Sequence, residues 1–254
     1  MTGLVDAWHR PAEPCHPDRV HLVYRERPSN ISHTVAWTGR STGAVDAHRV
    51  LPDGCMDLIW MGGQMVVAGP DTKAYLATWR ADMPYAALRF GRGVGPRVVG
   101  VPARELRDQR IPLDQLWSAA VTRSLEERLA HARAPATVLE AVVSERLRDT
   151  RPPDPVADMT ASHVGRGHSV ERIAERAGLS VRQLHRRCLD AFGYGPKTLA
   201  RIVRLNRALD IGRAGFAGAD AALASGYADQ AHLARDVRVL TGTTFAALVG
   251  VDEP

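Results

Sequence analysis

Two stretches near the carboxyl-terminal end repeat one pattern of turn and cap residues, and this repeat limits what the chain can fold into more than any other feature. In the first stretch, residues 169–189, Ser169 is a good N-cap for a short helix and Ser180 is a good N-cap for the next one. Gly178 stands between them, where a helix must end and the chain must turn, and a residue without a Cβ does this at the least cost. The pattern predicts two short helices joined by a tight turn.

The second helix of this unit has two unlike faces. Val181, Leu184 and Cys188 recur at the spacing of one helical face, and we expect all three to be buried. The opposite face carries Arg182, His185 and Arg186. A short helix with an apolar back and a cationic front suits the major groove of DNA, although a generic two-helix hairpin with a solvated charged face has the same pattern.

The second stretch, residues 221–242, repeats the first. Gly226 takes the turn, Tyr227 takes the packing position of Leu179, and Asp229 is the N-cap. The predicted buried stripe is Leu233, Val237 and Leu240, and the predicted outward face is Gln230, Ala231, Ala234 and Arg235. The glycines that close the two units after their second helices are Gly193 and Gly242.

A connecting segment joins the two units. Lys197 to Arg213 interleaves apolar residues with arginines and predicts one long helix, whose first turn accommodates Pro196. At about 1.5 Å per residue this helix is roughly 25 Å long. Such a rod can hold two recognition helices near one turn of DNA apart, which is about 34 Å, on one face of the duplex. The repeat therefore favours a DNA-binding domain.

These residues carry a resemblance to a known family. Residues 169–249 resemble the DNA-binding domain of the AraC/XylS family of bacterial transcription regulators, and GYADQAHLARDVRVLTG in the second unit is similar to the family signature G-(F/Y)-x-D-x-x-x-(F/L)-x-R-x-x-(K/R)-x-x-x-G. The resemblance implies base contacts from Arg182, His185 and Arg186 in the first unit and from Gln230, Ala231 and Arg235 in the second. We also expect phosphate contacts from Ser180, Lys197, Arg201, Arg204 and Arg238.

The sequence departs from the family pattern in three respects. Phe245 stands where proline is usual after the final glycine, which should change only the last turn. Ala221 and Ala222 are smaller than the usual pair, so we expect looser packing in the second unit. Cys188 replaces a usual aromatic residue. The second unit also presents fewer long polar side chains, and we expect the first unit to discriminate bases more sharply.

The charge distribution agrees with DNA binding. The 254-residue chain has a formal net charge of +5, and residues 166–238 hold thirteen Lys and Arg against seven Asp and Glu, so the rest of the chain is slightly acidic. A concentrated positive charge attracts DNA phosphates. The sequence contains no apolar run of about 18 residues and no secretory signal pattern, so we expect a cytoplasmic protein without membrane contact.

The amino-terminal half predicts β structure. From Arg19 to Phe90, short apolar or alternating runs are separated by turn residues such as those in Pro52-Asp53-Gly54. The runs are VHLVYRE, HTVAWT, AVDAHRVLP, MDLIWM, QMVVAG, AYLATW and YAALRF. Short strands at this spacing favour a small β-barrel or sandwich.

Helical patterns follow the strands. Residues 91–112 predict a Gly/Pro-rich loop with a short helix, and residues 113–149 predict two helices whose apolar stripes dimerisation could bury. Residues 150–158, TRPPDPVAD, predict a proline-rich linker. The expected order is an irregular segment 1–18, a β-barrel sensor domain with a helical pair at 19–149, the linker, and a DNA-binding domain at 159–254. The expected fold class is therefore a multidomain α+β protein with a carboxyl-terminal all-α double helix-turn-helix domain.

The amino-terminal half carries a second resemblance. HRVLPDGCMDLIW and GVPARELRDQRIPLDQLW resemble the amino-terminal domain of a subgroup of AraC-type regulators, which implies a cupin-like β-barrel sensor. An aromatic wall with a few polar groups is the common make-up of a small-molecule site. The candidate effector-binding residues are His48, Cys55, Asp57, Trp60, Trp79, Tyr85 and Arg89. The alternative is that the tryptophans are ordinary core residues.

Signatures of enzymes are missing from the sequence. Gly91–Pro96 lacks the Gly-Lys-Ser/Thr end of a phosphate loop, no Gly-x-Ser-x-Gly elbow occurs, and no His-x-His pair offers a cupin-type metal site. We therefore assign no catalytic residue, no metal site and no cofactor. The scattered Cys15, Cys55 and Cys188 indicate reduced thiols. The acidic neighbours Asp53 and Asp57 favour a structural over a reactive role for Cys55.

These patterns predict a one-component transcriptional regulator. Its expected partners are promoter or operator DNA, an unknown small-molecule effector, a second copy in a homodimer, and RNA polymerase. Activation or repression would depend on the position of the operator, which this chain does not encode. Two alternatives stay open: a small-molecule-modifying enzyme of cupin type with a helical docking domain, and an architectural DNA binder without an effector.

Overall fold

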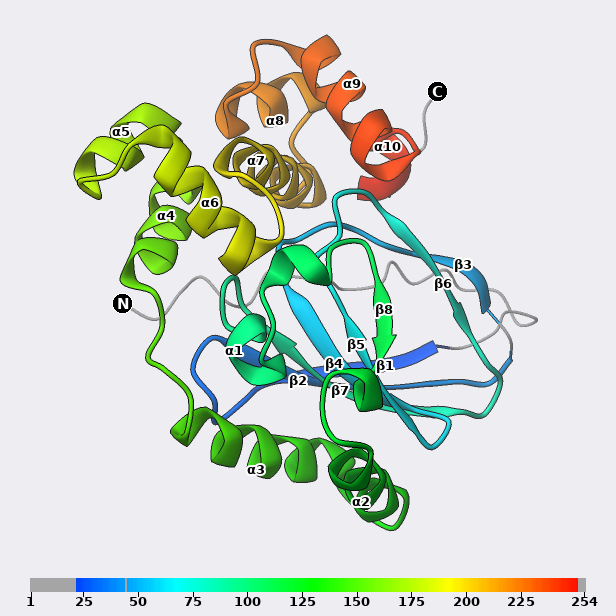
Figure 1. Cartoon of the computed structure of the whole chain (residues 1–254). Coiled ribbons are helices and arrows are strands. Elements are labelled where there is room, and N and C mark those ends of the chain that lie inside the picture. Colours follow the sequence, from blue (N-terminus) through cyan, green and yellow to red (C-terminus); the bar gives the residue numbers. More distant parts are fainter. Residues whose placement is uncertain (1–21, 44, 251–254) are drawn as a thin grey trace.

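The computed structural model describes residues 22–43 and 45–250 (Figure 1). The expected irregular segment 1–18 and Cys15 lie outside the described residues. The predicted strands all form, and one more follows them. They are β1 (Leu22–Pro28), β2 (Thr34–Ser41), β3 (Val45–Val50), β4 (Met56–Met61), β5 (Gln64–Ala68), β6 (Tyr75–Trp79), β7 (Pro84–Phe90) and β8 (Arg110–Pro112).

These strands are divided between two antiparallel sheets. Hydrogen bonds join six of them in the order β1-β2-β7-β4-β5-β8, and β3 pairs with β6 in a separate two-stranded ribbon. Alternation along β4 gives the larger sheet two apolar faces: Leu58 belongs to one core, and Ile59 packs against another. The expected sheet-rich amino-terminal domain followed by helices is confirmed.

Helices α2 (Ala119–Ala130) and α3 (Pro135–Arg148) cover one face of the larger sheet (Figure 1). Their apolar stripes include Leu125 and Leu139, which are buried in the same core as Leu58 and Leu88 of the sheet. These stripes led to the expectation that the two helices dimerise. The sheet already buries these stripes, so they give no reason to expect a dimer through α2 and α3.

The segment between β7 and α2 has more structure than the predicted loop with one short helix. It contains α1 (Gly95–Val99), η1 (Ala103–Glu105), β8 and η2 (Leu113–Gln115). Gly69 allows η1 to lie close to the sheet, because a Cβ at this position would be 1.7 Å from the carbonyl oxygen of Leu106. The Gly69 N–H also donates to the carbonyl of Gln109 at 2.9 Å. Gly69 thus fixes the position of η1, which in turn contacts the DNA-binding domain.

Both predicted two-helix units and the connecting helix are confirmed (Figure 1). The helices are α4 (Pro155–Gly165), α5 (Val170–Arg176), α6 (Val181–Phe192), α7 (Pro196–Arg213), α8 (Gly218–Ser225), α9 (Gln230–Thr241) and α10 (Phe245–Val249). The connecting helix α7 serves both units, with Leu199 and Ile202 in the core of the first and Leu205 and Leu209 in the core of the second. None of the described helices is both long and apolar enough to cross a membrane.

Three local expectations differ from the structure. The expected linker is non-helical only as far as Asp154, which caps α4, because the proline that follows fits the first turn of that helix. Val181 is 44% exposed instead of buried, since it is the first residue of α6 and the buried stripe starts at Leu184. Ala221 and Ala222 are both 0% exposed, so the small side chains leave no opening in the second unit.

The close approach at Gly69 predicts a stability effect. Gly69→Ala should lower the free energy of unfolding by about 1–3 kcal/mol, because the added methyl group meets backbone that must move. Urea unfolding followed by circular dichroism measures this. Gly165→Ala is the control, because nothing lies within 4 Å of its Cβ position, and it should be neutral or stabilising. Equal stability of the two variants would contradict the role of Gly69.

Candidate DNA-binding site

The two predicted recognition helices, α6 and α9, start and end on the residues that the sequence pattern identified. At the start of α6, Ser180 Oγ accepts from the Gln183 N–H at 3.2 Å and Gln183 Oε1 accepts from the Ser180 N–H at 2.8 Å. Asp229 caps α9 by accepting from the His232 N–H at 2.6 Å. Gly193 and Gly242 end the helices with left-handed φ values of 81° and 73°. The cap residues therefore determine where both helices begin and end.

The side chains predicted to contact bases are all exposed and lie in the first half of their helices. They are Arg182, His185 and Arg186 on α6 and Gln230, Ala231 and Arg235 on α9. The amino-terminal residues of a recognition helix are those that reach base edges in the major groove. The His185 ring is also positioned by the turn before α7, since a Cβ at Gly195 would be 2.4 Å from it. The base contacts themselves stay a prediction.

The residues predicted to contact phosphates fall into two groups. Ser180, Lys197 and Arg238 are exposed. Arg201 and Arg204 are half-buried and form ion pairs with Asp236 of α9, at 2.7 Å and 3.5 Å. Removing Arg201 would therefore leave the buried Asp236 carboxylate with only the longer ion pair to Arg204, so the loss of Arg201 does not test phosphate contact alone.

The sheet domain holds the first unit at the carboxyl-terminal end of α6. Arg104 of η1 forms an ion pair with Asp190 of α6. Arg107 donates to the Gly193 carbonyl at 3.5 Å, and a Cβ at Gly193 would meet Pro70 at 2.6 Å. The amino-terminal half of α6, which carries the predicted base contacts, is not covered by these contacts.

The sheet domain holds the second unit at the corresponding end of α9. The Ala74 N–H donates to the Leu240 carbonyl at 2.7 Å, and Arg49 of β3 donates to the Thr241 carbonyl. The last carbonyl groups of a helix have no partner within it. The sheet domain therefore supplies hydrogen-bond donors at the end of this recognition helix.

A buried contact joins the sheet domain to α7. Leu51, only 5% exposed, packs in the core of the second unit with Leu205 and Leu209. Next to it, Asn206 Nδ2 donates to the Pro52 carbonyl at 2.8 Å. The sequence carries no signal of these contacts, because each joins residues more than a hundred positions apart.

Most of the predicted effector-binding residues gather between the larger sheet and the β3–β6 ribbon. Trp79 lies 4.4 Å from Tyr85 and 5.9 Å from His48, measured between ring centroids. Arg89 Nε is 3.3 Å from Asp57, which also accepts from Trp37 Nε1 at 2.7 Å. These side chains pack against one another. Trp37 belongs to the cluster and was not among the predicted residues, since only its alternation within β2 hinted at its position.

Two of the predicted effector-binding residues lie outside this ring cluster, although Cys55 is close enough to Arg89 and Asp57 to interact with their charges. Trp60 is buried on the opposite face of the sheet with Met65, because alternation along β4 places it with Leu58 and not with Asp57. Cys55 lies before β4, and its backbone N–H donates to Asp53 at 2.8 Å. Burial and then the Asp53 carboxylate raise the pKa of the Cys55 thiol, which agrees with the structural role expected for it.

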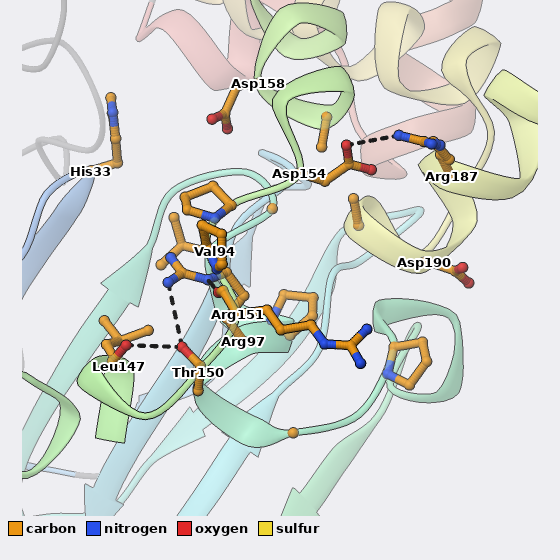
Figure 2. A pocket seen from close by; sticks show the side chains of 18 of the residues that line it. His33, Val94, Arg97, Leu147, Thr150, Arg151, Asp154, Asp158, Arg187 and Asp190 are labelled. Atoms are coloured by element: carbon orange, nitrogen blue, oxygen red, sulfur yellow. Dashed lines mark hydrogen bonds and ion pairs between the residues drawn. The ribbon is translucent and has the colours of Figure 1, made fainter. Parts of the chain in front are cut away.

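A groove of about 860 Å³ lies between the sheet domain and the first helix-turn-helix unit (Figure 2). Its lining includes Val94 of the sheet domain, the segment Thr150–Asp154, and Asp158 and Ala191 of the helical domain. Arg97 braces one wall by donating to the Arg151 carbonyl at 2.9 Å and to Thr150 Oγ1 at 3.3 Å. This volume is in the range of small-molecule sites, and the groove was not predicted from the sequence.

Comparisons with known proteins match both halves of the chain. Residues 173–249 match a family described as a helix-turn-helix domain, and residues 31–112 match a domain of unknown function. No curated protein matches the chain. A probable AraC family transcriptional regulator from Rhodopseudomonas palustris is 22% identical with a TM-score of 0.35, over 38% of this chain and 96% of that one.

Two structures of ToxT from Vibrio cholerae are similar over more of the chain. The apo form is 10% identical with a TM-score of 0.45, over 88% of this chain and 99% of that one. The form with bound unsaturated fatty acid is 10% identical with a TM-score of 0.44, over 90% of this chain and all of that one, at 100%. At these scores the similarity adds no detail to the site.

The matched family and the doubled units define the class of protein. Residues 173–249 match the helix-turn-helix domain family, and the structure forms two capped helix-turn-helix units joined by α7 in this part of the chain. The chain is accordingly a DNA-binding transcriptional regulator with a doubled helix-turn-helix domain.

A pair of histidines lies beside the first unit, where α4 leads into α5. His163 Nδ1 and His168 Nδ1 are 2.7 Å apart, and the two rings are stacked with centroids 4.8 Å apart. One imidazole must donate an N–H and the other must accept it, so the pair cannot hold a proton on both Nδ1 atoms in this arrangement. Burial, followed by His168 and then Arg176, lowers the pKa of His163.

The lowered pKa predicts that acid destabilises this protein. Unfolded histidine has a pKa near 6.5, so below about that pH the unfolded chain binds more protons than the folded one and stability falls. His163→Gln should therefore flatten the dependence of unfolding free energy on pH between about 7 and 5. Urea unfolding across this range, with the exposed His33→Gln as the control, measures it. Equal pH dependence in the wild type and His163→Gln would contradict the shift.

Proposed function

We propose that α6 and α9 read two neighbouring segments of operator DNA, with Arg182, His185 and Arg186 on the first helix and Gln230, Ala231 and Arg235 on the second. The observation that carries this proposal is that both helices expose their amino-terminal halves, while the sheet-domain residues that the structure describes bond to their carboxyl-terminal ends. Arginine binds guanine in two-pronged fashion in the major groove. Alanine offers only a methyl contact, so the first unit supplies most of the discrimination.

The sheet domain regulates DNA binding by bracing both units. It contacts α6 through Arg104 and Arg107, and it contacts α7 and α9 through Leu51 and Arg49. The docked arrangement leaves every predicted base-contacting residue exposed, so docking and DNA binding are compatible. A domain that holds both recognition helices in place lowers the conformational entropy that the protein loses when it binds DNA.

A small-molecule effector acts through this docking. The groove in Figure 2 is lined by the sheet domain, by Thr150–Asp154 and by the helical domain, so an occupant would bind the docked and undocked arrangements with different affinity. The cluster around Trp79 and Tyr85 is a less suitable site, since its rings fill the space between the sheets. A second copy of the chain and RNA polymerase are further expected partners of a regulator of this class.

The base-reading role predicts a loss of discrimination in one variant. Arg186→Ala should reduce the preference for operator over mutated operator by about 1–3 kcal/mol at one base step. Lys197→Ala removes an exposed cation of α7 and should weaken binding to operator and random DNA evenly. Fluorescence anisotropy with a duplex from the protein's own promoter measures both. Equal losses on specific and random DNA for Arg186→Ala would refute base reading by this residue.

If the sheet domain braces both units, residues of the sheet domain that lie far from the recognition surface should affect DNA affinity. The double variant Arg49→Ala/Arg104→Ala removes one contact to each unit and should weaken operator binding by at least about fivefold, the lower end of typical coupling between sites. The control, Arg40→Ala/Arg123→Ala, removes the same charge from exposed positions of the sheet domain. Operator affinity at matched salt measures both. If the two double variants bind equally well, the sheet domain does not brace the units.

A further inference from the structure

A second hollow, of about 330 Å³, lies between the two helix-turn-helix units, and we call it the cationic cleft. One wall is formed by α7, with Lys197, Arg201, Arg204 and Arg207. The other walls are the turn from Gly165 to Val170, before and into α5, and Ser225 and Gly226 at the turn of the second unit. No Asp or Glu lines the cleft among the residues that the structure describes.

The sequence of α7 places these cations on one side of the helix. Their spacings of four, three and three residues bring successive side chains to neighbouring positions on a helical face. From Lys197 to Arg207 the row extends about 15 Å along the axis, at about 1.5 Å per residue. A row of this kind holds several like charges close together, which is favourable only when anions compensate them.

Asp236 of α9 compensates part of this charge and positions two of the arginines. Its Oδ1 accepts from Arg201 Nε at 2.8 Å, and its Oδ2 is 3.5 Å from Arg204 Nη2. The Arg204 guanidinium also lies over the Tyr227 ring at 4.4 Å, and its buried Nε–H donates to no described group. Within the described part of the chain, Lys197 and Arg207 at the two ends of the row have no ion pair. The cleft therefore retains positive charge and one unused donor.

We propose that the cationic cleft binds a phosphate group, and that in the operator complex this is a backbone phosphate lying between the segments read by α6 and α9. The proposal rests on the base-reading function above, because the cleft is lined by residues of both units and by α7, which joins them. Arginine presents planar pairs of N–H donors that match phosphate oxygens. Gly165, Gly167 and Gly226 in the facing walls have no side chains to obstruct the anion.

The test uses the full chain and three variants. Arg207→Ala removes one end of the row, Arg207→Lys keeps the charge, and Arg213→Ala removes an arginine from the same helix outside the cleft lining. The slope of log Kobs against log salt is measured by anisotropy on a random-sequence duplex. Arg207→Ala should reduce the steepness of this slope by about 0.9, because one phosphate is no longer neutralised. Arg207→Lys and Arg213→Ala should leave the slope close to that of the wild type.

A second measurement distinguishes a DNA phosphate from a free one. Without DNA, the thermal unfolding of each protein is followed in inorganic phosphate and in chloride at equal ionic strength. An unchanged DNA slope, together with loss of the phosphate-specific stabilisation in Arg207→Ala alone, would place a free phosphate-bearing molecule in the cleft. If Arg207→Ala matches Arg213→Ala in both measurements, the cleft binds no phosphate and the proposal is overturned.

These outcomes are separate from a failure of base reading. The random duplex contains no operator, so the slope reports phosphate contact whether or not Arg186 reads a base. A reduced slope in Arg207→Ala, together with unchanged base discrimination in Arg186→Ala, would support phosphate binding in the cleft and contradict base reading by Arg186. An unchanged slope in Arg207→Ala, together with reduced discrimination in Arg186→Ala, would support base reading by Arg186 and contradict phosphate binding to DNA in the cleft.

Discussion

The carbonyl groups at the end of α9 cannot be satisfied within that helix, and the amino-terminal domain supplies their donors from Ala74 and Arg49. The same domain reaches the end of α6 through Arg104. These contacts place the sheet domain against α6 and α9 at the ends opposite to their predicted base-contacting residues. Almost every feature of the proposed regulation depends on this, because a domain docked over the other ends would have blocked the DNA-binding surface.

The helical domain is organised by α7 in a comparable way. Leu199 and Leu209 bury its apolar positions in the cores of the two units, and Arg201 and Arg204 reach Asp236 on α9. One helix thus contributes packing to both units and charge to the cleft between them. Because the spacing of the recognition helices depends on α7 and on the docked sheet domain together, binding at the groove between the domains and binding of DNA are expected to influence each other.

The repeated units were predictable because local chemistry determines them. Serine and aspartate are preferred N-caps and glycine is preferred where a helix ends in the left-handed region, so Ser180, Asp229 and Gly226 made the turns and the helices predictable. The strands followed from alternation. Candidate effector-binding residues were harder to predict, since an aromatic residue suits a core and a pocket equally. Alternation along β4 in fact separates Trp60 from Asp57.

By itself, the sequence determined the two capped units, the connecting helix and the strands, because each depends on residues within about a dozen positions of one another. Only the tertiary structure decided how the sheet domain meets the units, where α2 and α3 bury their apolar stripes, and which arginines of α7 are neutralised by Asp236. Contacts such as those of Leu51 with α7 join positions far apart in the chain. Neither composition nor periodicity specifies such partners, since any apolar side chain of suitable size is compatible with the local pattern.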